Sequence, residues 1–115
     1  MGDEEAPSLE AQLAAIADKY GAVAAPITKD REIAAADLAA LAPVFEAELA
    51  KIKAEPEGSA KGMAAAMLQA KTSCARDFHL QRIAECDAQL SRIATRQALD
   101  EAEAKAKAAP PEAEE

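Results

Sequence analysis

Both cysteines and the only histidine of the chain lie in the stretch "KTSCARDFHLQRIAEC", residues 71–86. On one helix, Cys74 and Cys86 would be about 18 Å apart along the axis, whereas a disulfide needs Cα atoms within about 7 Å. The residues three and four positions from His79 are alanine, arginine and isoleucine, and these cannot complete a tetrahedral zinc site. We therefore predict no metal-binding site and no disulfide in this stretch.

Other patterns that support catalysis are also absent from the sequence. The segment "EGSAKG" (57–62) lacks the spacing of a phosphate-binding loop and the hydroxyl that should follow its lysine. Glu46 and Glu48 are two residues apart and point to different sides of a helix. No serine or cysteine has a recognisable nucleophile turn with a base nearby. We predict that the protein is not an enzyme and that it has no catalytic residues and no cofactor.

Composition favours an all-α protein of one small domain. The chain has 115 residues, of which 33 are alanine, while valine, isoleucine, leucine and phenylalanine together number 19. Alanine is the best helix former and allows helix backbones to approach closely. The fold that we predict is therefore an elongated helical hairpin or a small three-helix bundle, with coiled-coil character and disordered acidic termini.

The net charge of -8 is concentrated at the two ends of the chain. Residues 1–8 contribute -3 and residues 100–115 contribute -4, which leaves -1 for the middle. Acidic tails disfavour binding to nucleic acid or to an anionic membrane. No stretch approaches the roughly 20 apolar residues of a membrane helix, and the acidic start does not resemble a secretory signal. We predict a cytoplasmic protein, or a component of a particle assembled in the cytoplasm, without nucleic-acid or membrane partners.

Helix-capping and helix-breaking residues predict the following organisation. A disordered acidic N-terminus spans 1–8, a helical domain spans 9–102, and a disordered low-complexity tail spans 103–115. Within the domain we expect Ser8 to cap a helix over 9–24, and the segment "APITKD" to form a loop. A helix over 32–55 with a break near Pro43 follows, and after "EPEGS" a helix capped by Ser59 spans 59–102.

Two apolar stripes follow each other along the predicted helix 59–102. Met63, Met67, Ala70, Cys74 and Phe78 form the first stripe, and Ile83, Cys86, Leu90 and Ile93 form the second. Because the stripe shifts around the helix near residue 79, the two halves should face different neighbours. We expect the first half to pack on residues 32–55 in a hairpin, and the opposite net charges of these segments favour that pairing.

The second stripe is our candidate interface, because a two-helix hairpin offers it no obvious neighbour. Helix 9–24 is the competing partner within the chain. A structural or adaptor protein that acts by helix–helix contact with a protein partner or with copies of itself fits these features, as would an assembly component. The alternative is an acidic inhibitor that mimics nucleic acid to block a DNA-binding enzyme, which needs carboxylates arrayed on an ordered face.

Overall fold

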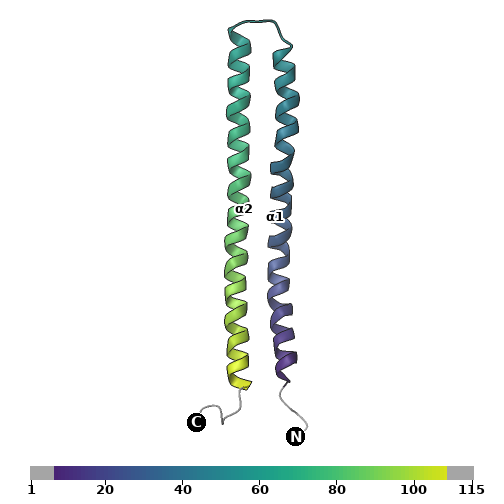
Figure 1. The fold of residues 1–115 in the computed structure, drawn as a ribbon, viewed down its shortest axis with the longest axis vertical. Helices are drawn as coiled ribbons and strands as arrows, with labels where there is room; N and C mark the ends of the chain where they lie inside the picture. Colours follow the sequence, from purple (N-terminus) through teal and green to yellow (C-terminus); the bar gives the residue numbers. More distant parts are fainter. Residues whose placement is uncertain (1–6, 109–115) are drawn as a thin grey trace. The chain divides into compact units, whose positions relative to one another are not determined.

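The computed structural model describes residues 7–108, and these residues form two α-helices and no strand (Figure 1). Helix α1 spans Leu9–Lys53 and helix α2 spans Ser59–Ala108, with residues 54–58 between them. The all-α prediction is confirmed, and the described residues contain two helices rather than the three of a bundle. The segments 1–6 and 109–115, which belong to the predicted disordered ends, lie outside the described residues. Neither described helix has an apolar stretch that could cross a membrane.

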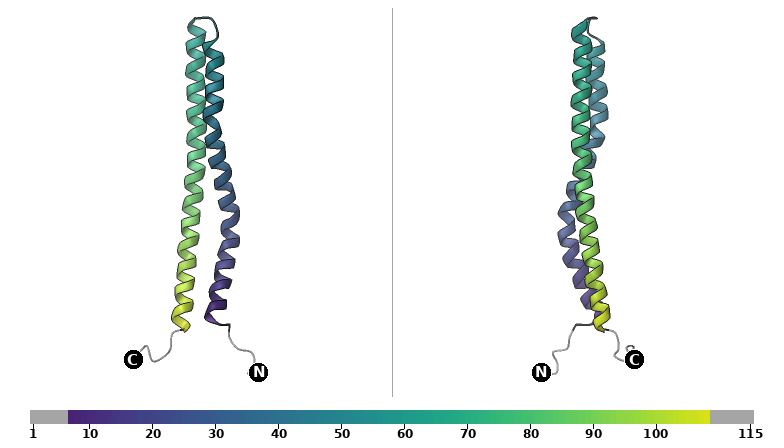
Figure 2. Two further views of the ribbon diagram at one scale, coloured as in Figure 1. Left: turned by 45° about the vertical axis from the view of Figure 1, so that its right-hand side comes forward. Right: turned by 90° about the vertical axis from the view of Figure 1, so that its left-hand side faces the viewer.

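The chain divides into two compact units. Unit 1 pairs the part of α1 up to Thr28 with the part of α2 from Ala88, and unit 2 comprises Lys29–Asp87. Within each unit, the α1 and α2 segments run antiparallel, side by side (Figure 2). Unit 2 is therefore a helical hairpin. The first half of α2 pairs with the second part of α1, as the sequence predicted. The second half pairs with the first part of α1, which the sequence analysis gave as the alternative to a second chain.

The start of α1 is capped by Ser8, as predicted. Its side-chain Oγ accepts a hydrogen bond from the backbone N–H of Ala11 at 3.1 Å, and its carbonyl accepts one from Gln12 at 2.9 Å. These bonds satisfy donors that the first turn of a helix leaves without a partner. Glu10 also lies in this turn, where its charge complements the helix dipole.

The predicted interruptions of α1 are wrong, because the helix continues through Pro26 and Pro43. A proline inside a helix removes one hydrogen bond and costs roughly 3 kcal/mol. Both prolines are exposed, so water can hydrate the carbonyl groups that they leave without a partner. A loop would cost more, because it would remove several hydrogen bonds together with the contacts of α1 on α2.

Those contacts are continuous along α1, although large apolar residues do not mark them throughout. From residue 24 to residue 45 the buried or half-buried side chains recur at alternating steps of three and four, the spacing of a coiled-coil seam. The residues with this spacing are Ala24, Ile27, Arg31, Ala34, Leu38, Leu41 and Phe45, and Ala35 beside them is half-buried as well. Alanine and arginine occupy three of these positions, so a search for large apolar side chains finds a gap where the helix continues.

The end of α2 also differs from the prediction. We expected the helix to end near Ala102, whereas it extends to Ala108. Ala104 is only 8% exposed, so this last part of α2 packs in unit 1. The pair Lys107 and Glu103 is spaced by four residues with 3.6 Å between charged atoms, which adds modest helix stability. Residues 103–108 therefore belong to the helical domain.

Lys61 ties α2 to the end of α1 across the connection. Its Nζ donates a hydrogen bond to the backbone carbonyl of Lys53 at 3.0 Å and forms an ion pair with Glu57 at 2.9 Å. The carbonyl belongs to the last turn of α1, where a positive charge complements the helix dipole. Its side chain is 19% exposed, so this lysine is partly enclosed by the turn it stabilises.

Replacing this lysine should weaken the turn. In Lys61→Met the apolar stem remains but the carbonyl of Lys53 loses its charged donor, and we expect the free energy of unfolding to fall by about 1 kcal/mol. Urea unfolding followed by circular dichroism measures this loss. Lys71→Met is the matched control, because Lys71 is exposed and forms none of the described ion pairs. Equal stability of the two variants would contradict this role of Lys61.

Candidate interaction surface

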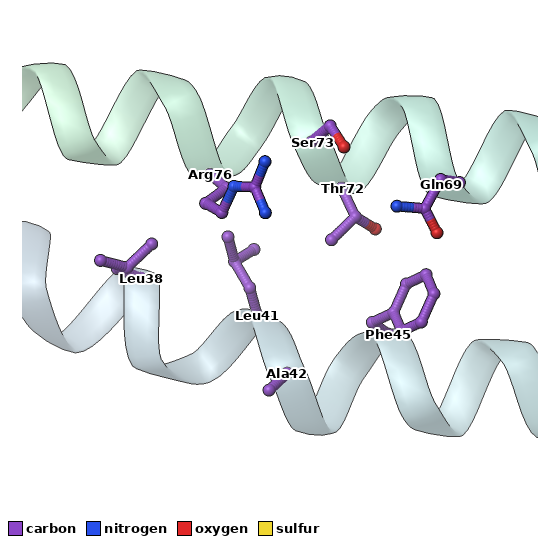
Figure 3. A pocket seen from close by; sticks show the side chains of 8 residues that line it. All are labelled: Leu38, Leu41, Ala42, Phe45, Gln69, Thr72, Ser73 and Arg76. Atoms are coloured by element: carbon purple, nitrogen blue, oxygen red, sulfur yellow. The ribbon is translucent and has the colours of Figure 1, made fainter.

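In unit 2, the side of α2 that faces α1 carries mostly small or polar residues. The half-buried positions, most of which recur at steps of four and three, are Lys61, Ala64, Ala65, Leu68, Thr72, Ser73, Ala75, His79, Arg82, Ile83 and Cys86. Opposite them, α1 contributes the larger apolar side chains of Leu38, Leu41 and Phe45. Figure 3 shows these three side chains directed toward α2, from which Thr72 and Arg76 project toward them.

Two grooves run along this contact, one on each side of it. The first has a volume of about 290 Å³ and is lined by Leu38, Leu41, Ala42, Phe45, Gln69, Thr72, Ser73 and Arg76 (Figure 3). The second, of about 190 Å³, is lined by Leu41, Val44, Phe45, Glu48, Leu68, Lys71, Thr72 and Ala75. Their floors are apolar and their few polar groups do not converge on one point. The grooves follow from helix packing and show no arrangement of acid, base and nucleophile.

Two ion pairs join the helices of unit 2. Arg31 of α1 binds both carboxylate oxygens of Asp87 of α2, at 2.5 and 3.3 Å. Arg82 of α2 binds Asp37 of α1 at 3.3 Å. The hydrogen bond from Arg31 lowers the pKa of Asp87, and the same bond raises the pKa of Arg31. The second pair has the predicted polarity, with the acid on α1 and the base on α2, whereas the first has the reverse.

The first apolar stripe lies on the outer side of α2, where we expected it to pack against α1. We name Met63, Met67, Ala70, Cys74 and Phe78 the outer stripe. The three large side chains are 65%, 66% and 60% exposed in that order, and Ala70 and Cys74 are exposed as well. The prediction failed because it placed the larger apolar residues inside, whereas the seam uses smaller residues that allow the backbones to approach.

Phe78 is held by its neighbours on α2 and is nevertheless open to solvent. Its ring meets the His79 ring edge-on, with 5.5 Å between centroids. The Arg82 guanidinium lies 5.8 Å from the centre of the Phe78 ring, within range of a cation–π interaction. Arg82 therefore contacts both Phe78 and Asp37, and this arrangement orders an aromatic side chain at the surface.

The predicted interface residues Ile83, Cys86, Leu90 and Ile93 are half-buried and have neighbours within the chain. Ile93 lines a groove of unit 1 with Tyr20, Val23 and Ile27. Cys86 directly precedes Asp87, whose carboxylate binds Arg31 of α1. Our reason for expecting a second chain at these residues does not hold, and their role between molecules stays a prediction.

Unit 1 contains a tyrosine hydrogen bond between the helices. Tyr20 is 8% exposed and its hydroxyl donates to the Asp100 carboxylate. This hydrogen bond is the main reason that the pKa of Tyr20 lies above its usual value, and Arg96 opposes the shift. Arg96 also approaches Asp100 at 3.9 Å. These contacts position the helices, and they present no nucleophile to a ligand.

The cysteines and the histidine of the opening question do not come together. Both thiols are free, with Cys74 exposed and Cys86 half-buried. Among residues 7–108, no three His, Cys, Asp or Glu side chains form a group that could hold a metal ion. Comparisons with protein-family models, with curated proteins and with solved structures find no match to this chain. The function must therefore be inferred from the surface of the molecule.

The tyrosine can be tested by titration, because Tyr20 is the only tyrosine of the chain. The pKa of Tyr20 is raised in the folded chain. The hydrogen bond to Asp100 therefore stabilises the fold below pH 10, and this stabilisation is lost as the pH rises through the folded pKa. Phenolate absorbance should show a pKa above 10 in the native chain and a value closer to 10 in Asp100→Asn. Glu101→Gln removes a neighbouring charge without touching the Tyr20 bond and should leave the pKa raised.

Two adjacent residues of α2 test which side faces inward. Met67 is exposed and Leu68 is half-buried. Met67→Glu should change the free energy of unfolding by no more than about 0.5 kcal/mol in dilute solution. Leu68→Glu should lower it by about 2 kcal/mol or more, because a carboxylate loses water at the helix contact. Denaturant unfolding measures both values, and the reverse order would show that the outer stripe faces α1.

Proposed function

We propose that the protein is a non-enzymatic structural or adaptor protein that acts by helix–helix contact with a protein partner or with copies of itself. The observation that carries this proposal is the exposure of the outer stripe. In unit 2, α2 directs mostly small and polar side chains toward α1, together with Leu68 and Ile83, and leaves the large side chains of the outer stripe exposed to solvent. Exposed apolar stripes of this kind mark interaction surfaces in folded proteins.

The energetics of a two-helix unit support the need for a partner. Only Tyr20, Ala34 and Ala104 are buried among the hydrophobic residues described. Burying apolar surface stabilises by about 25 cal/mol per Å², and two helices alone enclose little of it. A third helix laid on the outer stripe would remove Met63, Met67 and Phe78 from water, and association would therefore stabilise the chain.

The charge pattern of this surface resembles that of a protein interface. Between Ser59 and Phe78 the only charged residues are Lys61, Lys71, Arg76 and Asp77, and Lys61 is held at the turn. Interface centres are depleted in charge and enriched in methionine and aromatic residues.

The two free thiols fit a reducing compartment, so we propose that the protein is located in the cytoplasm or in a particle assembled there.

The alternative, an acidic mimic of nucleic acid, receives less support. Residues 7–108 contain fifteen acidic and thirteen basic residues, so the described part is nearly neutral. Asp37, Glu57 and Asp87 are each paired with a cation. A mimic needs an ordered row of carboxylates available to a basic DNA-binding cleft, and pairing reduces what this surface offers.

The proposal can be tested in the native host by photocrosslinking. A photoreactive phenylalanine analogue in place of Phe78 should give covalent adducts with protein, and Met67→Glu in the same chain should reduce them at least severalfold. The matched control carries the analogue in place of Ala47, an exposed residue of α1. Adducts of equal yield at both positions, or none at position 78, would contradict an interaction through the outer stripe.

A further inference from the structure

We propose that the outer stripe binds a second copy of the same chain, with the two α2 helices antiparallel across a two-fold axis between residues 70 and 71. This inference rests on the proposed function and names the partner of that surface. It places Met63 against Phe78 of the second copy and Met67 against Cys74 of the second copy.

The spacing of the outer stripe is the reason for choosing a second copy. From Met63 the stripe continues after four residues to Met67 and after three more to Ala70. Without Ala70, the stripe residues Met63, Met67, Cys74 and Phe78 are spaced by four, seven and four residues, so their spacing reads the same in both directions, and Ala70 would lie at the level of Lys71 of the second copy. A two-fold axis at the midpoint therefore brings each large apolar position onto another apolar position. A symmetric dimer requires this self-complementarity, in which residue i meets j and j meets i, whereas an unrelated partner does not.

The side chains that would meet are also complementary in size and chemistry. The long side chain of Met67 would face the small side chain of Cys74, so neither crowds the other. A methionine sulfur against an aromatic ring is a favourable contact, and Met63 with Phe78 supplies two such contacts in the dimer. Ala60, Ala66 and Ala70 are exposed on the same side of α2, and small residues allow helix axes to approach closely.

Electrostatics limit the strength of this dimer. Asp77 is the only acidic residue between Ser59 and Phe78, and its side chain is 73% exposed. Lys71 lies at its edge, where its long stem can keep the charge in water. The two-fold axis brings the two Lys71 side chains near each other, and like charges weaken association. We therefore infer a weak dimer, which forms at high concentration and becomes tighter when this charge is removed.

Disulfide crosslinking of the full-length chain tests both the partner and its direction. In Cys86→Ser background, Met67→Cys should form a disulfide between Cys74 of one copy and the new cysteine of the other under mild oxidation. Within one copy these positions are seven residues apart, about 10 Å along the helix, which is too far for a disulfide. Peptide mass spectrometry of the covalent dimer identifies the bond.

Two controls separate the antiparallel arrangement from others. The variant with Met67→Cys, Cys74→Ser and Cys86→Ser should not crosslink if the helices are antiparallel, and should crosslink through position 67 if they are parallel. Sedimentation equilibrium should show a dimer of the unmodified chain that Met67→Glu dissociates without loss of helix content. Lys71→Ala should lower the dissociation constant severalfold, because it removes the like-charge contact at the axis.

The outcomes distinguish this inference from the proposed function. A chain that stays monomeric at roughly millimolar concentration, or one that crosslinks only through position 67, overturns the antiparallel second copy. If position 78 then still forms photoadducts with another protein, the proposed function stands with a different partner. A chain that is monomeric and forms no adduct at position 78 contradicts both. A disulfide between positions 67 and 74 of two copies, with tighter association of Lys71→Ala, supports the dimer.

Discussion

The single line along which two helices pack is the contact on which each unit depends, and in unit 2 most of the α2 side chains on this line are small or polar. Ala34 is completely buried, and Tyr20 and Ala104 are 8% exposed. Two helices touch along one line only, so even large residues on that line, such as Leu41 and Phe45, remain half-buried. Alanine makes this contact effective because it brings the backbones together and loses no side-chain entropy on burial. The stability of each unit therefore comes from many small contacts.

Polar contacts between the helices determine how they align. In unit 2, Arg31 meets Asp87 and Arg82 meets Asp37. These residues are exposed to half-buried, and such pairs contribute little free energy each. These ion pairs fix the alignment of the two helices, because a shift of one helix along the other would separate both pairs at once. Contacts between alanine side chains alone would allow such a shift. In unit 1 the hydrogen bond between Tyr20 and Asp100 has the same effect.

In unit 2, mostly small residues of α2 pack against α1, and larger apolar residues of α2 therefore lie at the surface. Met63, Met67 and Phe78 would improve a helix contact by their size, but they would also force the helix axes apart. With mostly small and polar residues facing α1, Met63, Met67 and Phe78 remain 60 to 66% exposed on the outer side of α2. This division links the packing of the hairpin to its proposed function, because the residues that do not stabilise the chain alone are those that a partner can bury.

Local properties of the sequence determined much of the fold. The alanine content predicted the all-α class, Ser8 predicted the start of α1, and "EPEGS" predicted the separation of α1 from α2. Each of these depends on residues within one turn of the feature, where capping and helix propensity act. The sequence also predicted that the first half of α2 packs on the second part of α1, since the order of the segments along the chain allows few alternatives. It left open whether the second half packs on the first part of α1 or on a second chain.

Two features of the fold, the continuity of α1 and the inward face of α2, are determined only by the tertiary structure. The continuity of α1 through Pro26 and Pro43 depends on contacts with α2, which outweigh the one hydrogen bond that each proline removes. The choice of inward face on α2 could not be predicted, because alanine occurs on all sides of the helix and the hydrophobic pattern therefore does not select one. What selects the face is the distance to which both backbones can approach, and that distance depends on the side chains of the two helices together.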